Sequence, residues 1–193
     1  MTITVGGTNI TFSDSTTQGS ASGPYVGYKG QIFTASGTFT VPTGVTAVKI
    51  TAVGPGGAGG TNYSGGAAAG NTSFGAYVVA NGGGGSSYYG NNPGAGGTAS
   101  GTSSPQAFNG SAGGTTGCFG GGAGGPAGAL IYITYGYGCG GQNGSNASGG
   151  GGGAVAVGYV TGLTSGGSVS VTIGAVGSSG AGSGQPGIVY VEW

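Results

Sequence analysis

The side chains that could carry out acid–base or electrostatic chemistry are few, and histidine is absent from the chain. The charged residues are Asp14, Lys29, Lys49 and Glu192. General acid–base catalysis, metal binding and phosphate binding all require side chains that titrate, coordinate or carry charge. Between Ile50 and Val191 the sequence contains no charged side chain. We therefore expect that the protein is not an enzyme, holds no metal and uses no cofactor.

The same scarcity of charge limits the partners that the protein can bind. Nucleic-acid binding depends on Lys and Arg side chains that neutralise phosphates, and the chain has two such residues and a net charge of zero. A nucleotide-binding P-loop needs a lysine after its glycines, and no lysine follows Lys49. We expect neither nucleic acid nor nucleotide as a ligand.

Aromatic residues inside or beside glycine tracts are the other group that could bind a partner. A ring that projects from a loop of glycine and serine offers a large, rigid contact surface, while the small neighbours adapt to the partner. The alternative is that these rings cover the glycine tracts as their only available core. The residues are Tyr63, Tyr88, Tyr89, Phe108, Phe119, Tyr135 and Tyr137.

Cys118 and Cys139 both lie in glycine-rich surroundings. A disulfide between them and two buried free thiols are both compatible with the sequence.

Glycine accounts for 56 of the 193 residues, so an ordinary side-chain core cannot hold the chain together. Ordering a glycine costs about 0.5–1 kcal/mol more than ordering an alanine. A dense network of backbone hydrogen bonds, or burial between copies of the chain, must offset this cost. Short runs rich in Tyr, Phe, Val and Ile separate the glycine tracts, which argues against a disordered chain.

A small β element is predicted at the N-terminus. Thr2–Val5 and Thr8–Phe12 are β-prone runs joined by Gly6-Gly7, a dipeptide suited to a hairpin turn. Residues 13–30 show no sustained period and indicate a linker or attachment arm. We accordingly divide the chain into an N-terminal attachment element, residues 1–30, and a glycine-rich β domain, residues 31–193.

Period-two patterns predict the strands of the second domain. Gln31–Ala35 and Thr38–Val41 flank Ser36-Gly37 and are expected to form a hairpin, with Phe39 and Val41 on one face. In the next predicted strand, Val45–Val53, Lys49 is expected at the solvent face or at an edge. The further predicted strands are Val45–Val53, Thr72–Ala80, Ala129–Tyr135, Ala154–Thr161, Ser168–Ile173 and Ile188–Trp193.

The glycine tracts between these strands lack a strict three-residue period in sequence, which argues against a collagen triple helix. They could form packed polyglycine II helices, with three residues per turn and hydrogen bonds between neighbouring tracts. They could equally be loops between the strands of an ordinary β-sandwich. Either way the fold class is all-β, with short antiparallel strands in a sandwich-like arrangement.

Several segments resemble virion proteins of tailed bacteriophages. Phe33–Ile50, which continues into Gly54–Gly60, is similar to the strand pair that opens a glycine-rich region in these proteins. Gly167–Ile173 and Gly187–Trp193 are similar to the segments that close it. Ile10–Gln18 resembles a segment found in many phage tail-fibre proteins.

This resemblance implies a tail fibre or receptor-binding adhesin on the phage particle that mediates host attachment. It further implies a homotrimer that is joined to other virion proteins through its N-terminal segment. Its aromatic residues would bind a glycan or an outer-membrane protein on the host surface. Two alternatives remain: a non-adhesive decoration or structural protein of the capsid or tail, and, more remotely, an ice-binding protein that presents a flat, uncharged polyglycine face.

Overall fold

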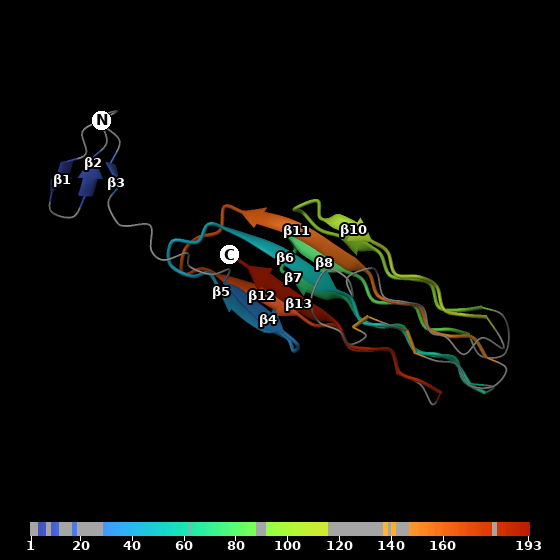
Figure 1. Cartoon of the computed structure of the whole chain (residues 1–193). Helices are drawn as coiled ribbons and strands as arrows, with labels where there is room; N and C mark the ends of the chain where they lie inside the picture. Colours follow the sequence, from blue (N-terminus) through green and yellow to red (C-terminus); the bar gives the residue numbers. More distant parts are fainter. Residues whose placement is uncertain are drawn as a thin grey trace.

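The structure is a computed structural model, shown in Figure 1. It describes residues 4–6, 9–11, 17–18, 29–61, 63–87, 92–115, 137–138, 140–141, 147–178 and 181–193. The described residues form strands and extended segments, and they contain no helix. The predicted all-β class is confirmed. The strands make one small sheet of three strands and two antiparallel sheets of five strands each.

The small sheet is N-terminal and has the order β1-β2-β3. Its strands are β1 (Thr4–Gly6), β2 (Asn9–Thr11) and β3 (Thr17–Gln18). β1 and β2 are antiparallel as predicted, but Gly6 pairs with Asn9 and so belongs to the strand rather than to the turn. β3 lies in the stretch that was predicted to be a linker. No strand was predicted there, and β3 pairs with β2.

The two larger sheets are named here after their central strands. The β6 sheet has the order β10-β11-β6-β13-β4. Its strands are β4 (Gly30–Phe33), β6 (Ala47–Val53), β10 (Gln106–Phe108), β11 (Val155–Thr161) and β13 (Ile188–Glu192). The β7 sheet has the order β5-β12-β7-β8-β9. Its strands are β5 (Gly37–Thr40), β7 (Thr72–Phe74), β8 (Val78–Ala80), β9 (Ala99–Ser100) and β12 (Ser168–Thr172).

The inner faces of these two sheets share one hydrophobic core. Ile50 on β6 and Phe74 on β7 are fully buried in the same cluster. Phe39 lies between two other rings, with its centroid 5.7 Å from that of Phe74 and 5.5 Å from that of Trp193. Alternating residues of β6, β12 and β13 face this core, as expected for two packed antiparallel sheets.

The predicted hairpin of Gln31–Ala35 and Thr38–Val41 is wrong. β4 pairs with β13 in one sheet, whereas β5 pairs with β12 in the other, so the chain crosses between the sheets here. The Ser36 hydroxyl stabilises the crossing by accepting a hydrogen bond from the Ile173 N–H at 2.9 Å. The prediction that Phe39 and Val41 share one face is confirmed, because both side chains are buried in the core.

The single strand predicted over Thr72–Ala80 is also wrong, because this stretch is the β7–β8 hairpin. Gly75 has φ +52°, a left-handed conformation that ends β7 and reverses the chain. β6, β11, β12 and β13 confirm four other predicted strands. The run Ala129–Tyr135 lies outside the described residues. β9 and β10 were not predicted.

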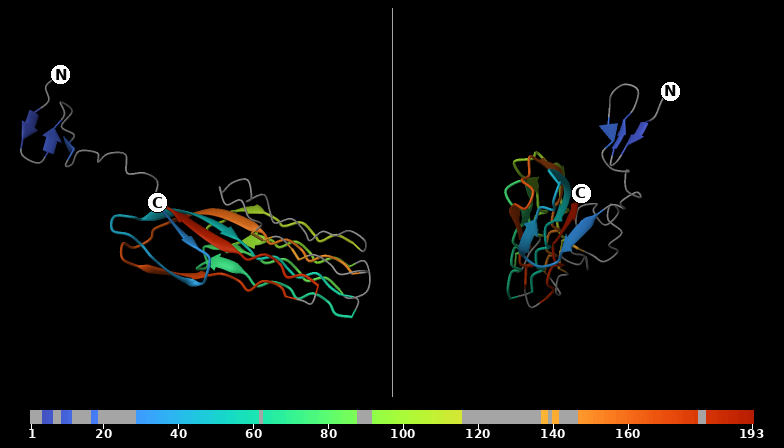
Figure 2. Two further views of the ribbon diagram at one scale, coloured as in Figure 1. Left: turned by 60° about the horizontal axis from the view of Figure 1, so that its bottom comes forward. Right: turned by 90° about the vertical axis from the view of Figure 1, so that its left-hand side faces the viewer.

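Glycine-rich segments continue from one end of the strands and run side by side, as Figure 1 and the left view of Figure 2 show. We call them the glycine bundle. It comprises residues 54–60, 64–70, 81–87, 92–98, 109–115, 140–141, 147–154, 174–178 and 181–187. A further glycine tract in the sequence, Gly120–Gly125, lies outside the described residues.

Hydrogen bonds in the bundle repeat every three residues. In segment 147–154, residues three apart donate to the same neighbouring segment, so that consecutive residues donate to three different neighbours. Gly149 donates to Gly114, and Gly152 donates to Ser111. Gly150 donates to Gly141, and Gly153 donates to Gly138. Gly151 donates to Gly84, and Ala154 donates to Asn81. Backbone groups that no side chain covers are thereby paired.

Glycine is required in the bundle because the backbones touch directly. A Cβ on Gly151 would overlap the carbonyl oxygen of Ala95, and a Cβ on Gly110 would overlap that of Gly152. Similar overlaps occur throughout segments 81–87 and 92–98. The bundle therefore packs backbone against backbone, whereas the sheets pack side chain against side chain.

Candidate functional site

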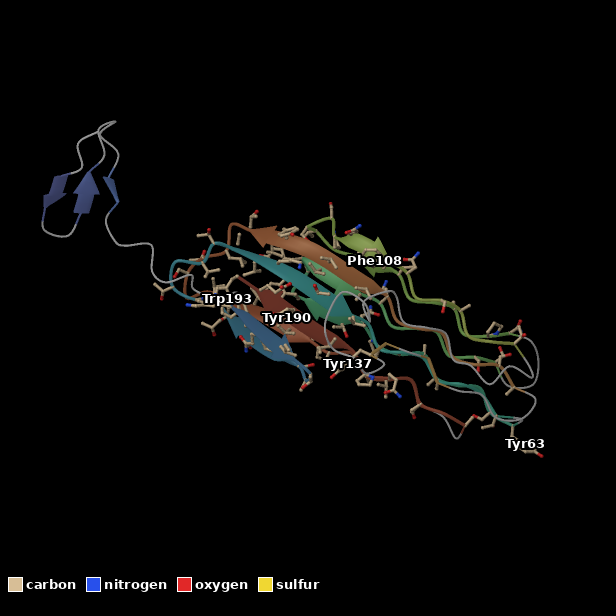
Figure 3. All side chains as sticks on the ribbon, in the orientation of Figure 1. Tyr63, Phe108, Tyr137, Tyr190 and Trp193 are labelled. Atoms are coloured by element: carbon tan, nitrogen blue, oxygen red, sulfur yellow. The ribbon has the colours of Figure 1, made fainter. Side chains whose placement is uncertain are left out.

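The connection between segments 54–60 and 64–70 lies at the end of the bundle that is farthest from the sheets. Figure 3 shows Tyr63 at this position. The Thr61 hydroxyl oxygen accepts hydrogen bonds from the backbone N–H of Tyr63 at 3.2 Å and of Ser64 at 3.0 Å. The Thr61 N–H donates to the Ser64 carbonyl at 2.7 Å. These bonds fix the backbone while the Tyr63 side chain stays 93% exposed.

A second connection lies beside the first. The Ser87 N–H donates to the Asn92 carbonyl at 3.1 Å, which joins the ends of segments 81–87 and 92–98. A Cβ on Gly60 would lie 2.7 Å from the Ser87 carbonyl oxygen and 3.2 Å from that of Ser64, so both connections meet at the same end of the bundle. We call this end the tip. The residues between Ser87 and Asn92 include Tyr88 and Tyr89, which lie outside the described residues.

Phe108 and Tyr137 lie away from the tip. Both are partly buried and pack against Val53, Val155 and Ile188, a small cluster on the outer face of the β6 sheet. In Figure 3 they lie near the strands, whereas Tyr63 lies at the far end of the bundle. The structure thus brings these two rings together as cover for a hydrophobic cluster. They cover apolar side chains of the sheet, whereas the alternative interpretation of the sequence had such rings cover the glycine tracts.

The remaining residues that the sequence singled out are outside the described part of the chain. They are Phe119, Tyr135, Cys118 and Cys139. Their roles as receptor contacts and as a possible disulfide stay predictions.

A groove on the outer face of the β6 sheet was not anticipated from the sequence. It has a volume of about 710 Å³ and is lined by residues of β6, β10, β11 and β13. Lys49 and Glu192 face each other in it, with Nζ and Oε2 3.1 Å apart. Lys49 is on the solvent face of a central strand, which confirms the predicted solvent face. Tyr159 carries the most exposed ring of the groove, at 70%.

The signal for this groove was present in the strand pattern. Tyr159, Lys49 and Glu192 all stand at outward positions of their strands, and the register pairs Lys49 with both of the others. The sequence alone could not place these strands side by side. The residues of the groove come from segments that are far apart along the chain, so this site was not predicted from the sequence.

The described residues contain no cluster of three or more metal-ligating side chains. Among the same residues, no helix is long and apolar enough to cross a membrane. No protein family, curated protein or solved structure matches the chain.

Proposed function

We propose that the protein is a receptor-binding adhesin or tail fibre of a tailed bacteriophage, which attaches the particle to its host by binding without catalysis. The observation that carries the proposal is the tip: a charge-free bundle ends in a turn that fixes the backbone and exposes Tyr63. Tyrosine is a common anchor in binding loops because its ring gives a large contact area at a low entropic cost. The resemblance of the flanking segments to phage virion proteins supports the same function.

We further propose that the glycine segments are polyglycine II helices. This conformation has three residues per turn, and the direction of the backbone N–H groups in segment 147–154 repeats with that period. The overlap that a Cβ would create at glycines such as Gly110 and Gly151 is the second support, because such helices pack at backbone distance. A bundle of this kind is a rigid rod that holds its connecting turns away from the sheets.

The assembly that we propose is a homotrimer on the phage particle, joined to other virion proteins through residues 1–30. The large glycine content favours burial between copies, and the tail-fibre resemblance of Ile10–Gln18 favours attachment through the N-terminal part. Mass photometry of the purified chain should show a species of three times 17.6 kDa. A stable monomer at micromolar concentration would refute the trimer.

Competition for adsorption tests the adhesin function directly. Purified protein should occupy the host receptor, a surface glycan or an outer-membrane protein, and so reduce the adsorption of the phage that encodes it. Protein that coats phage particles but never binds host cells would instead identify the non-adhesive decoration. Thermal hysteresis in a freezing-point assay would point to the ice-binding alternative.

A further inference from the structure

We propose that the groove on the outer face of the β6 sheet is a second binding site, and that its ligand is a neutral saccharide. We call it the ion-pair groove. Its wall and floor include Lys49, Thr51, Gln106, Tyr159, Tyr190 and Glu192. The proposal does not depend on the tip, because the groove lies on the strands, where Figure 3 shows Tyr190, and Tyr63 lies at the opposite end of the bundle.

Strand register brings the groove residues together in two rows. Val157 on β11, Thr51 on β6 and Tyr190 on β13 form one row across the sheet. Tyr159, Lys49 and Glu192 form the next row on the same face. Because side chains of paired residues stand on one face, the floor of the groove is built on three neighbouring strands. Sites on such elements hold their groups in a defined geometry.

The charges in the groove favour a ligand without net charge. Lys49 and Glu192 are two of the three charged residues in the described part of the chain, and they neutralise each other at 3.1 Å. An ammonium has three donors and a carboxylate has several acceptor positions, so both groups can take part in more than one hydrogen bond. A hydroxyl group both donates and accepts, so adjacent hydroxyls of a sugar match this pair. An anion or a cation would have to compete with the partner already present.

The rest of the groove suits the apolar face of a sugar ring. The Tyr159 side chain is 70% exposed and presents a flat apolar ring with a polar hydroxyl, the combination that amphipathic ligands require. Gln106 adds an amide that can donate and accept. The volume of about 710 Å³ is in the usual range for sites of small molecules.

One wall of the groove is fixed by a strained turn. Ser104 has φ +48°, and it is the one residue other than glycine with a positive φ in the described part of the chain. Its N–H donates to the Gly101 carbonyl at 3.2 Å, while the Ser103 hydroxyl donates to the Tyr77 carbonyl at 2.7 Å. Strain of this kind persists where the surroundings hold it, and it is concentrated at functional sites. The turn therefore gives the groove a preformed wall.

Titration of the full-length protein with neutral monosaccharides and disaccharides tests the proposal. Hexoses and N-acetylhexosamines are added at up to tens of millimolar and followed by isothermal calorimetry and by NMR line broadening of the sugar. We expect saturable binding that Tyr159→Ala weakens by about tenfold or more, because the stacking surface is lost. Tyr159→Phe should stay within about threefold of the natural protein, since it keeps the ring.

Two controls make the result decisive. Tyr159 is on the surface, so circular dichroism should show that Tyr159→Ala is folded. Tyr63→Ala should leave saccharide binding unchanged, which separates the groove from the tip. The proposal is overturned if none of these sugars binds, if Tyr159→Ala binds as well as the natural protein, or if a charged saccharide binds better and is released by salt.

Discussion

Thr61 organises the tip through its side-chain hydroxyl and its backbone N–H. Its hydroxyl accepts two backbone hydrogen bonds, and its N–H donates a third bond to Ser64. The backbone around Tyr63 is therefore ordered before any partner arrives, which reduces the entropy lost on binding. The contribution of this exposed ring to binding can therefore be measured by replacing Tyr63 alone.

We predict that Tyr63→Ala weakens the competition for adsorption by at least about tenfold, whereas Tyr63→Phe retains most of it, because the ring provides the contact area. The stability of both variants should lie within about 0.5 kcal/mol of the natural protein, since the side chain is 93% exposed. Adsorption assays with purified variants, together with thermal unfolding, measure the two effects. If Tyr63→Ala competes for adsorption as well as the natural protein does, Tyr63 is not part of the receptor site.

Glycines in the bundle should be far less tolerant than glycines elsewhere. A Cβ on Gly151 would overlap the Ala95 carbonyl, so we predict that Gly151→Ala lowers the free energy of unfolding by about 3 kcal/mol or more. Gly37→Ala is the matched control, because a Cβ there meets only the Phe33 ring at 3.6 Å, an ordinary contact. It should change stability by less than about 1 kcal/mol. Urea unfolding of both variants provides the comparison.

At the scale of the elements, the sequence predicted strands well where a period-two pattern was long. β6 and β11 each have seven residues with a buried inner face, and both were found. β9 and β10 have only two and three residues, too few to show a period. The hairpin predicted at Ser36-Gly37 failed for another reason. Local turn residues indicate that a chain bends, but they do not indicate whether the next strand joins the same sheet.

The candidate sites were predicted less completely than the strands. The importance of rings beside glycine was inferred, and Tyr63 is indeed displayed. Phe108 was grouped with it, although it packs on Val155, because composition cannot distinguish a ring at a bundle end from a ring at a strand end. The ion-pair groove depends on strand pairing between residues 49, 159 and 192. A local sequence pattern does not indicate which distant strands pair or in which register.

The β7–β8 hairpin gives a prediction at this scale. Gly75 has φ +52°, so we expect Gly75→Ala to lower the free energy of unfolding by about 1–2 kcal/mol through left-handed strain. Gly75→Asn should be milder, because asparagine tolerates this conformation better than alanine. Denaturant unfolding of the pair separates backbone strain from crowding. Equal losses in both variants would mean that contact of the new Cβ with Tyr77 and Val169 dominates.

The molecule as a whole carries almost no charge where it would meet a host cell. The stretch from Ile50 to Val191 has no charged side chain, so attachment by the tip should not depend on long-range electrostatics. We predict that the adsorption rate changes by less than about twofold between about 50 and 500 mM salt. Adsorption kinetics across this range measure the effect. A steep fall with salt would show that charge elsewhere drives attachment.

Backbone-to-backbone packing in the glycine bundle also has a thermal consequence. Unfolding of an ordinary domain exposes much apolar surface and raises the heat capacity by about 12–15 cal/mol/K per residue. Unfolding of this bundle would expose mainly peptide groups, whose hydration lowers the heat capacity. Differential scanning calorimetry should therefore give a per-residue increment below the usual range. A small increment flattens the curve of stability against temperature, so the rod would hold its turns in place over a wide span of temperatures.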